Sequence, residues 1–336
     1  MRTRTRLALA AAGVAAALAL VPLAFSKPAA LSPVPEAITV SARPLASFRP
    51  KDETRRFGPL EFRGGLVLSS EFAGFGGISG FALENDGRFL AVTDAGLFLS
   101  GHLDTEGDRP VGLSDVTAAA LLDDQGRIQA TRGRGDAESI AIGPDAVYVG
   151  METINEIWRY PRAPLGEKGR VVPAPAIKGL KRNLGVESLA YVPSGPYKGL
   201  LIAVGEEGAG KDADLPGFII GGPVPGTFAI ARSGPFAATD LAIAPDGTMY
   251  LLERHYSPLT GVFMQIRRFA LADVKPGARL TGEVLGSFDL GYEIDNMEGL
   301  AVTRNAAGET LLTIVSDDNF SLLQRTILLR FAVVPD

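Results

Sequence analysis

One short pattern recurs five times in this chain and restricts its fold more than any other feature. Each copy has an acidic or small residue followed by small and aliphatic residues, a turn and a second strand-like segment. The copies are anchored at Ser79, Glu138, Glu187, Asp240 and Glu298. Regular repeats of about fifty residues, each long enough for four strands, are typical of a β-propeller. An all-β sandwich would not explain this spacing.

The last copy is too short to make a complete blade. It predicts only three strands, at Glu298–Thr303, Thr310–Ser316 and Gln324–Val333. The segment Gly64–Phe72 precedes the first copy and lacks a partner. We therefore expect an all-β fold, a single propeller of about five four-stranded blades, in which this N-terminal strand closes the ring and removes the open sheet edges. The irregular stretch Gly205–Ile230 leaves room for a sixth blade.

The N-terminal region predicts export. In residues 1–26, three arginines precede an alanine- and leucine-rich run, and Ala24-Phe25-Ser26 offers a small-x-small cleavage site. An uncleaved N-terminal anchor is the alternative. Residues 27–56 are rich in proline, alanine and serine and predict a flexible lead-in, so that residues 57–336 would form the propeller domain. The expected location is the periplasm or the medium.

Composition excludes several kinds of site. The 336 residues contain no cysteine and only two histidines, His102 and His255, so disulfides, thiolate metal sites and a multi-histidine zinc site are not expected. The formal net charge of −5 argues against a nucleic-acid partner. We expect a small-molecule substrate, no membrane contact after signal cleavage, and a monomer.

Acidic residues recur at two places in the repeat. One place is the start of the first strand and the other is the end of the second; in antiparallel neighbours these lie at the same end of the sheet. Second-strand ends carry Asp94, Glu152, Glu206, Glu207, Glu253, Asp317 and Asp318. Crowded carboxylates raise one another's pKa unless a cation compensates, and hard oxygen ligands favour Ca²⁺ or Mg²⁺. The predicted metal ligands are Glu138, Glu187, Asp240, Glu298, Asp317 and Asp318. The alternative is that each acid caps a turn or pairs with an arginine.

The predicted catalytic residues are Glu253, Arg254, His255 and Arg325. An arginine offers a fork of donors that suits phosphate or carboxylate, and a histidine can act as a general acid or base. Alternatively, the arginines neutralise the acidic ring and His255 is a structural residue. No Gly-x-Ser-x-Gly nucleophile elbow is present.

Several longer motifs resemble the phytase-like domain family, also called esterase-like activity of phytase. They are SDDNFSLLQRTILLRF at 316–331, DNMEGLA at 295–301, LERHYSPLTG at 252–261, DAESIAI at 136–142 and NLGVESLA at 183–190. The resemblance extends from about Gly64 to Val333. Its motif positions are Glu138, Glu187, Glu253, Arg254, Glu298, Asp317, Asp318, Asn319, Gln324 and Arg325.

The resemblance implies a β-propeller that hydrolyses phosphate or other esters. The related calcium-dependent propeller phytases hold Ca²⁺ in a carboxylate-rich channel mouth. The sequence lacks the dense lysine and arginine clusters that a highly phosphorylated inositol would need. We therefore expect an exported, phytase-like or esterase-like hydrolase that uses Ca²⁺ or Mg²⁺. The alternative is a non-catalytic propeller that binds a ligand or a protein partner on the same face.

Overall fold

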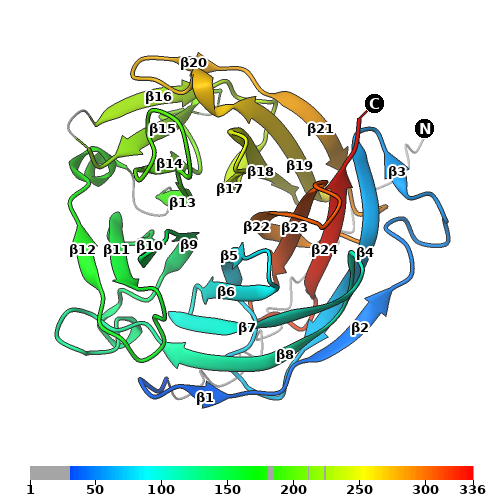
Figure 1. Cartoon of the computed structure of the whole chain (residues 1–336), viewed down its shortest axis with the longest axis horizontal. Helices are drawn as coiled ribbons and strands as arrows, with labels where there is room; N and C mark the ends of the chain where they lie inside the picture. The colour runs from blue at the N-terminus through cyan, green and yellow to red at the C-terminus, as the bar shows by residue number, and fades with distance from the viewer. Residues whose placement is uncertain (1–30, 181–184, 211, 223–224, 336) are drawn as a thin grey trace, which may run out of the picture.

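The computed structural model describes residues 31–180, 185–210, 212–222 and 225–335. Within these ranges the chain forms 24 strands and three short 3-10 helices, and contains no α-helix. The strands make five sheets that surround a common axis as the blades of a propeller (Figure 1). No helix in the described ranges is long and apolar enough to cross a membrane. The predicted all-β propeller is confirmed, and it has five blades. The predicted signal segment, residues 1–26, lies outside the described residues.

Each blade has four antiparallel strands, which follow one another from the axis outward. Blade 1 contains β5 (Ile78–Leu83), β6 (Arg88–Thr93), β7 (Leu97–Glu106) and β8 (Arg109–Ala120). Blade 2 contains β9 (Ala137–Ile142), β10 (Ala146–Met151), β11 (Glu156–Pro161) and β12 (Arg170–Val172). Blade 3 contains β13 (Val186–Tyr191), β14 (Leu201–Gly205), β15 (Leu215–Ile220) and β16 (Gly226–Ile230). The stretch Gly205–Ile230 left room for a sixth blade in the sequence. Its described residues belong to blade 3.

The last two blades complete the ring. Blade 4 contains β17 (Ala237–Ile243), β18 (Thr248–Ser257), β19 (Gly261–Ala270) and β21 (Glu283–Phe288). Blade 5 contains β22 (Asn296–Arg304), β23 (Thr310–Asp317), β24 (Thr326–Val333) and β4 (Leu60–Ser69). A short strand, β20 (Arg279–Leu280), pairs in parallel with the outer edge of β16.

The N-terminal strand closes the ring as predicted. β4 pairs antiparallel with β24, with Leu66 opposite Leu328, and becomes the outer strand of blade 5. The two strands lie side by side although one is near the start of the chain and the other near its end (Figure 1). The strand begins at Leu60, four residues before the predicted start, because it also pairs with β3 (Arg56–Phe57).

The segment expected to be a flexible lead-in is packed onto the propeller from residue 31 onward. β1 (Glu36–Ala37) pairs with β8, and β2 (Ser41–Leu45) pairs with β4. Phe48 is completely buried and packs against the rings of Phe288 and Phe331. The proline-rich composition of this region predicted flexibility, although the region contains a few large apolar side chains. These side chains bury enough surface to hold the segment in place.

The core lies between blades rather than within them. There are five apolar clusters, each shared by two neighbouring blades. The innermost strands pack in the cyclic order β5, β9, β13, β17, β22 and back to β5. They approach closely, since a Cβ on Gly299 would lie 2.6 Å from Phe81 Cβ and one on Gly80 would lie 3.0 Å from the backbone nitrogen of Ile140. This close approach explains the small residue that recurs in the repeat.

Candidate functional site

A β-bulge interrupts the innermost strand of every blade at the same place. One residue there has no partner on the second strand, while its two neighbours remain paired. The bulged residues are Ser79, Glu138, Glu187, Thr239 and Glu298. A bulge redirects a side chain without ending the strand. In three blades it brings a glutamate into the group of acids described next.

The end of each second strand supplies another side chain at the same face. In blades 1, 2 and 3 the residue just past this strand donates its backbone N–H back to the segment before the first strand. The five equivalent residues are Asp94, Glu152, Glu206, Arg254 and Asp317. Asp136, two residues before the bulged Glu138, adds one more carboxylate. We call the eight acids together the acidic cluster: Asp94, Asp136, Glu138, Glu152, Glu187, Glu206, Glu298 and Asp317.

Two groups of three carboxylates within the acidic cluster could hold a metal ion. Oxygens of Asp136, Glu138 and Glu152 lie within 4.8 Å of one another, and so do oxygens of Glu152, Glu187 and Glu206. Glu152 belongs to both triads, so the two candidate positions adjoin. Asp94 Oδ1, beside the triads, is buried and has no hydrogen-bond partner among the described residues, so this oxygen is free to accept a proton or a ligand. A donor set made only of carboxylates suits a hard cation.

Burial is the main cause of raised pKa values in the acidic cluster, and neighbouring carboxylates add to it. Burial and the charge of Asp317 raise the pKa of Asp94 to about 7. The same two causes raise the pKa of Glu298 to about 8, and burial raises the pKa of Asp317 to about 6. The pKa values of Glu138 and Glu187 also lie well above the ordinary range. Neighbouring carboxylates thus act in the predicted direction, although burial has the larger effect.

Arg254 is the guanidinium that meets the acidic cluster. Its Nη1 donates to Glu298 Oε1 at 2.8 Å and to the side-chain oxygen of Asn296. The side-chain Nδ2 of Asn296 in turn donates to Glu298 Oε1 at 2.7 Å. Its Nη2 lies 3.6 Å from Glu206 Oε1. Arg254 therefore adjoins the second triad directly. Because the side chain keeps one quarter of its surface exposed, it can still meet a ligand.

Two predicted site residues, Glu253 and Asp240, do not face the acidic cluster, and in each case the adjacent residue in the sequence takes the expected place. Glu253 is fully buried and accepts two hydrogen bonds of 2.6 Å from Arg267, so it does not join the acidic cluster. Successive side chains of a strand point to opposite faces, so Arg254 takes the place predicted for Glu253. Asp240 uses its oxygens to accept the backbone N–H groups of Leu241 and Leu300. It occupies the small-residue position of the repeat, since Thr239 is the bulged residue.

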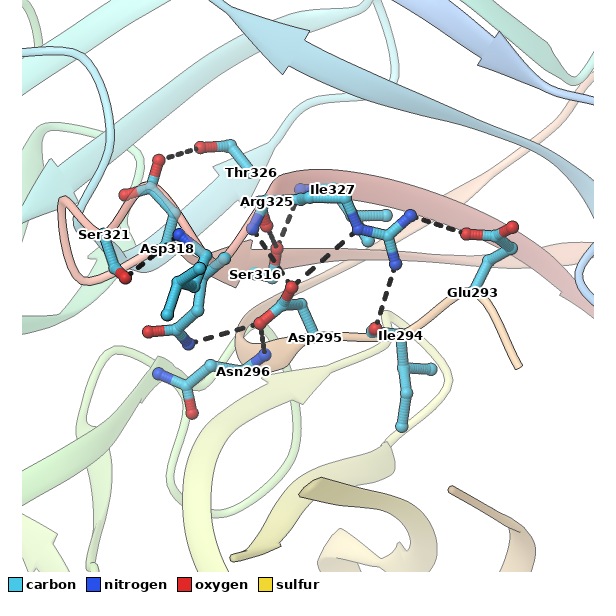
Figure 2. Close-up of polar contacts among 12 residues, drawn as sticks. Glu293, Ile294, Asp295, Asn296, Ser316, Asp318, Ser321, Arg325, Thr326 and Ile327 are labelled. Atoms are coloured by element: carbon cyan, nitrogen blue, oxygen red, sulfur yellow. Dashed lines mark hydrogen bonds and ion pairs between the residues drawn. The ribbon is translucent and has the colours of Figure 1, made fainter. Parts of the chain in front are cut away.

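The other predicted residues are held in separate networks (Figure 2). Asp318 accepts hydrogen bonds from Thr326 Oγ1 at 2.8 Å and from the backbone of Gly77. Arg325 donates to Glu293 at 2.8 Å and to the backbone oxygen of Ile294, and its backbone N–H binds Asp295. Asn319 takes the left-handed conformation in the turn after β23. Gln324 donates to Asp295 Oδ1 at 3.2 Å.

His255 lies against aromatic rings rather than among the acids. Its imidazole is 6.2 Å from the ring of Phe236 and 5.8 Å from that of Phe263. Of the five triad residues, sequence reasoning selected Glu138 and Glu187 as ligands but not Asp136, Glu152 or Glu206. Glu298 and Asp317, which it also selected, belong to neither triad. A signal was present, because Asp136 and Glu138 are two residues apart and therefore share one face of an extended segment.

Comparison with known proteins gives one family and several distant structural relatives. The family model described as Phytase-like, esterase-like activity of phytase, matches residues 73–320. No match is found among curated proteins. Glutaminyl cyclase from Myxococcus xanthus is 17% identical, with 77% of this chain and 92% of that chain covered and a TM-score of 0.42. The major Malassezia sympodialis allergen Mala s 1 is 15% identical, with 80% and 87% covered and a TM-score of 0.42. The chain belongs to the phytase-like family, whose model carries the description esterase-like activity of phytase.

Proposed function

We propose that this protein is a divalent-metal-dependent hydrolase of phosphate or other esters. The observation that carries the proposal is the acidic cluster, in which four blades contribute eight carboxylates and the remaining blade contributes Arg254. So much like charge in a partly buried place is unfavourable unless a cation binds there. The family name supports ester hydrolysis as the reaction.

Ca²⁺ is the cation that we propose, with Mg²⁺ as the alternative. Ca²⁺ accepts six to eight oxygen ligands in flexible geometry, whereas Mg²⁺ requires a nearly ideal octahedron. Asp136, Glu138 and Glu152 would hold one ion, and Glu152, Glu187 and Glu206 a second. When bound, such an ion polarises an ester oxygen and lowers the pKa of a coordinated water.

The chain's own side chains would supply the remaining chemistry. Arg254 can donate to an oxygen of the substrate and stabilise the negative charge that develops there. Asp94, with a pKa of about 7, can take a proton from water and return it to the leaving group near neutral pH. Glu298 holds Arg254 in place through their 2.8 Å contact.

The test is a hydrolysis screen of phosphomonoesters and carboxyl esters, with calcium and with chelator. The informative variant is Glu206→Gln, which removes one ligand of the second triad. Its control is Glu207→Gln, since Glu207 belongs to neither triad and pairs with Arg232 at 3.1 Å. We expect calcium-dependent turnover that the first variant loses and the second retains. If no ester is hydrolysed under either condition, the protein is a non-catalytic binding propeller.

We also propose that the protein is exported, on the basis of residues 1–26. Cell fractionation with an antibody, combined with N-terminal sequencing of the recovered protein, tests this. Recovery in the periplasm or medium with a start near Lys27 would support export.

A further inference from the structure

Large apolar side chains are exposed beside the acidic cluster. Five of the eight such residues in the described ranges lie at three loops of blades 4 and 5, four of them on the loops and Tyr256 near the end of β18, and 56% to 96% of their surface is exposed. We call them the leucine rim: Tyr256, Leu259, Leu290, Leu322 and Leu323. A monomer that keeps this much apolar surface in water usually uses it for binding.

The three loops lie at the same face as the acidic cluster. The hairpin between β18 and β19 extends past Arg254, which is paired with Met264. The segment from β21 leads into β22 at Asn296, and the loop from β23 to β24 follows Asp317. All three therefore emerge where the cluster's side chains emerge.

The loops also contact one another. Arg325, at the end of the loop that carries Leu322 and Leu323, binds Glu293 in the segment that carries Leu290 (Figure 2). Gln324 of the same loop binds Asp295 in that segment. Leu290 in turn covers the tip of the β18–β19 hairpin, since a Cβ on Gly261 would lie 2.5 Å from Leu290 Cδ1. The leucine rim is thus one continuous border of the site.

We infer that the leucine rim docks the protein onto a lipid surface, and that the substrate is an ester carrying a long apolar chain presented at that surface. The substrate part rests on the proposed function. The two most exposed positions, Leu259 and Leu322, are on separate loops with polar neighbours such as Ser257 and Ser321. Apolar tips of this kind can enter an acyl-chain boundary one by one, whereas a protein partner would meet a flatter apolar centre.

The charge of the site selects the kind of lipid surface. The three loops that carry the leucine rim contain four acids, Asp289, Glu293, Asp295 and Asp318, against one arginine, Arg325. This excess of negative charge repels an anionic surface, so the docking surface is zwitterionic. The same charge balance disfavours a substrate with many phosphates. One cation-binding cluster with one guanidinium suits a single ester group whose remaining bulk is apolar. Docking of this kind would differ from the expectation that the mature chain has no membrane contact after signal cleavage.

Vesicle flotation tests the docking without requiring turnover. The full chain is mixed with phosphatidylcholine vesicles, and the wild type is compared with the double variant Leu322→Ser/Leu323→Ser. The control is Val171→Ser, which replaces an exposed apolar residue on β12 of blade 2. We expect the wild type and the control to float, and the double variant to lose roughly tenfold or more in partitioning.

Three results would overturn the docking inference. They are a wild type that does not float, a double variant that floats as well as the wild type, and a control that loses as much as the double variant. Matching thermal melts confirm that the variants are folded, which we expect because the substituted leucines are about 90% exposed. In buffer with chelator, stronger binding to phosphatidylglycerol than to phosphatidylcholine vesicles would overturn the zwitterionic surface.

A chain-length comparison tests the substrate class. Esters with the same head group and a short or long alkyl chain are offered to the wild type and to the double variant. We expect faster turnover of the long-chain ester by the wild type only, and equal turnover of the short-chain ester by both. Equal rates for both chain lengths would overturn the substrate class and leave the hydrolase proposal standing. Rim-dependent flotation without hydrolysis of any ester would refute the hydrolase proposal and the substrate class and leave the docking standing.

Discussion

Calcium should stabilise this protein, and Glu152→Gln should remove most of that stabilisation. Glu152 is the carboxylate that both triads share, so its loss affects both candidate cation positions. At a calcium concentration one hundred times the dissociation constant, binding adds about 2.7 kcal/mol to the free energy of unfolding. If the variant binds a hundredfold more weakly, the same calcium adds only about 0.4 kcal/mol.

These energies translate into a measurable change of melting temperature. An unfolding entropy of about 2.1 cal/mol/K per residue over roughly 300 residues is about 0.6 kcal/mol/K, so the wild type should gain about 4 °C and the variant less than about 1 °C. With chelator the variant should melt at or above the wild-type temperature, because one charge has left a crowded group of like charges.

Differential scanning calorimetry of both proteins, with calcium and with chelator, makes the comparison. Glu207→Gln is the control, since it removes a neighbouring charge that belongs to neither triad. A wild type that shows no calcium shift would refute the metal site. A shift of the same size in Glu152→Gln would refute the assignment of the ligands.

Three further predictions concern the folded state. With chelator, the free energy of unfolding measured in urea should fall as the pH rises from 5 to 8. The pKa values of Asp317, Asp94 and Glu298 are about 6, 7 and 8 in the folded protein against 3.8 to 4.5 in the unfolded chain, so the folded state binds more protons in this range and loses stability as they dissociate. A constant or rising free energy of unfolding would contradict the raised pKa values. Glu253→Gln should lower the free energy of unfolding by about 3–5 kcal/mol, because it leaves Arg267 buried without its carboxylate. Glu283→Gln, in an exposed pair with Arg268, should lower it by less than about 1 kcal/mol. Similar losses in the two variants would refute the distinction between the buried and the exposed ion pair. Phe48→Ala should cost about 3–5 kcal/mol if the N-terminal segment is part of the core, and a cost near zero would show that this segment is dispensable.

The blades and their closure were predictable because they follow from regular spacing. A repeat of about fifty residues with alternating apolar positions leaves few all-β solutions, and the three strands of the last repeat require a fourth from elsewhere in the chain. The pairing of β4 with β24 meets that requirement. The packed N-terminal segment was not predictable in this way, because Phe48 is a single large side chain in a stretch without periodicity.

The site was predictable only up to a shift of one residue. Each inner strand contains a bulge, so the residue that faces the other acids cannot be found by counting alternate positions from the strand centre. In blade 4 the bulge in β17 brings Thr239 rather than Asp240 to the site. On β18, Arg254 rather than Glu253 faces the site because successive side chains of a strand alternate. Both acids instead satisfy buried partners, and a sequence pattern cannot distinguish that role from ligand binding.

The five blades carry different residue types at the same two positions, so the charge differs from one side of the site to the other. Blades 2, 3 and 5 place acids at both positions. In blades 2 and 3 these acids, together with Asp136, form the two triads joined by Glu152. Blade 4 places Thr239 at the bulge and Arg254 at the strand end, so its contribution is a donor and a positive charge. Because Glu206 belongs to a triad and lies 3.6 Å from Arg254, a cation held by that triad and the guanidinium would adjoin. In the proposed reaction, an ester oxygen held by one would then be within reach of the other.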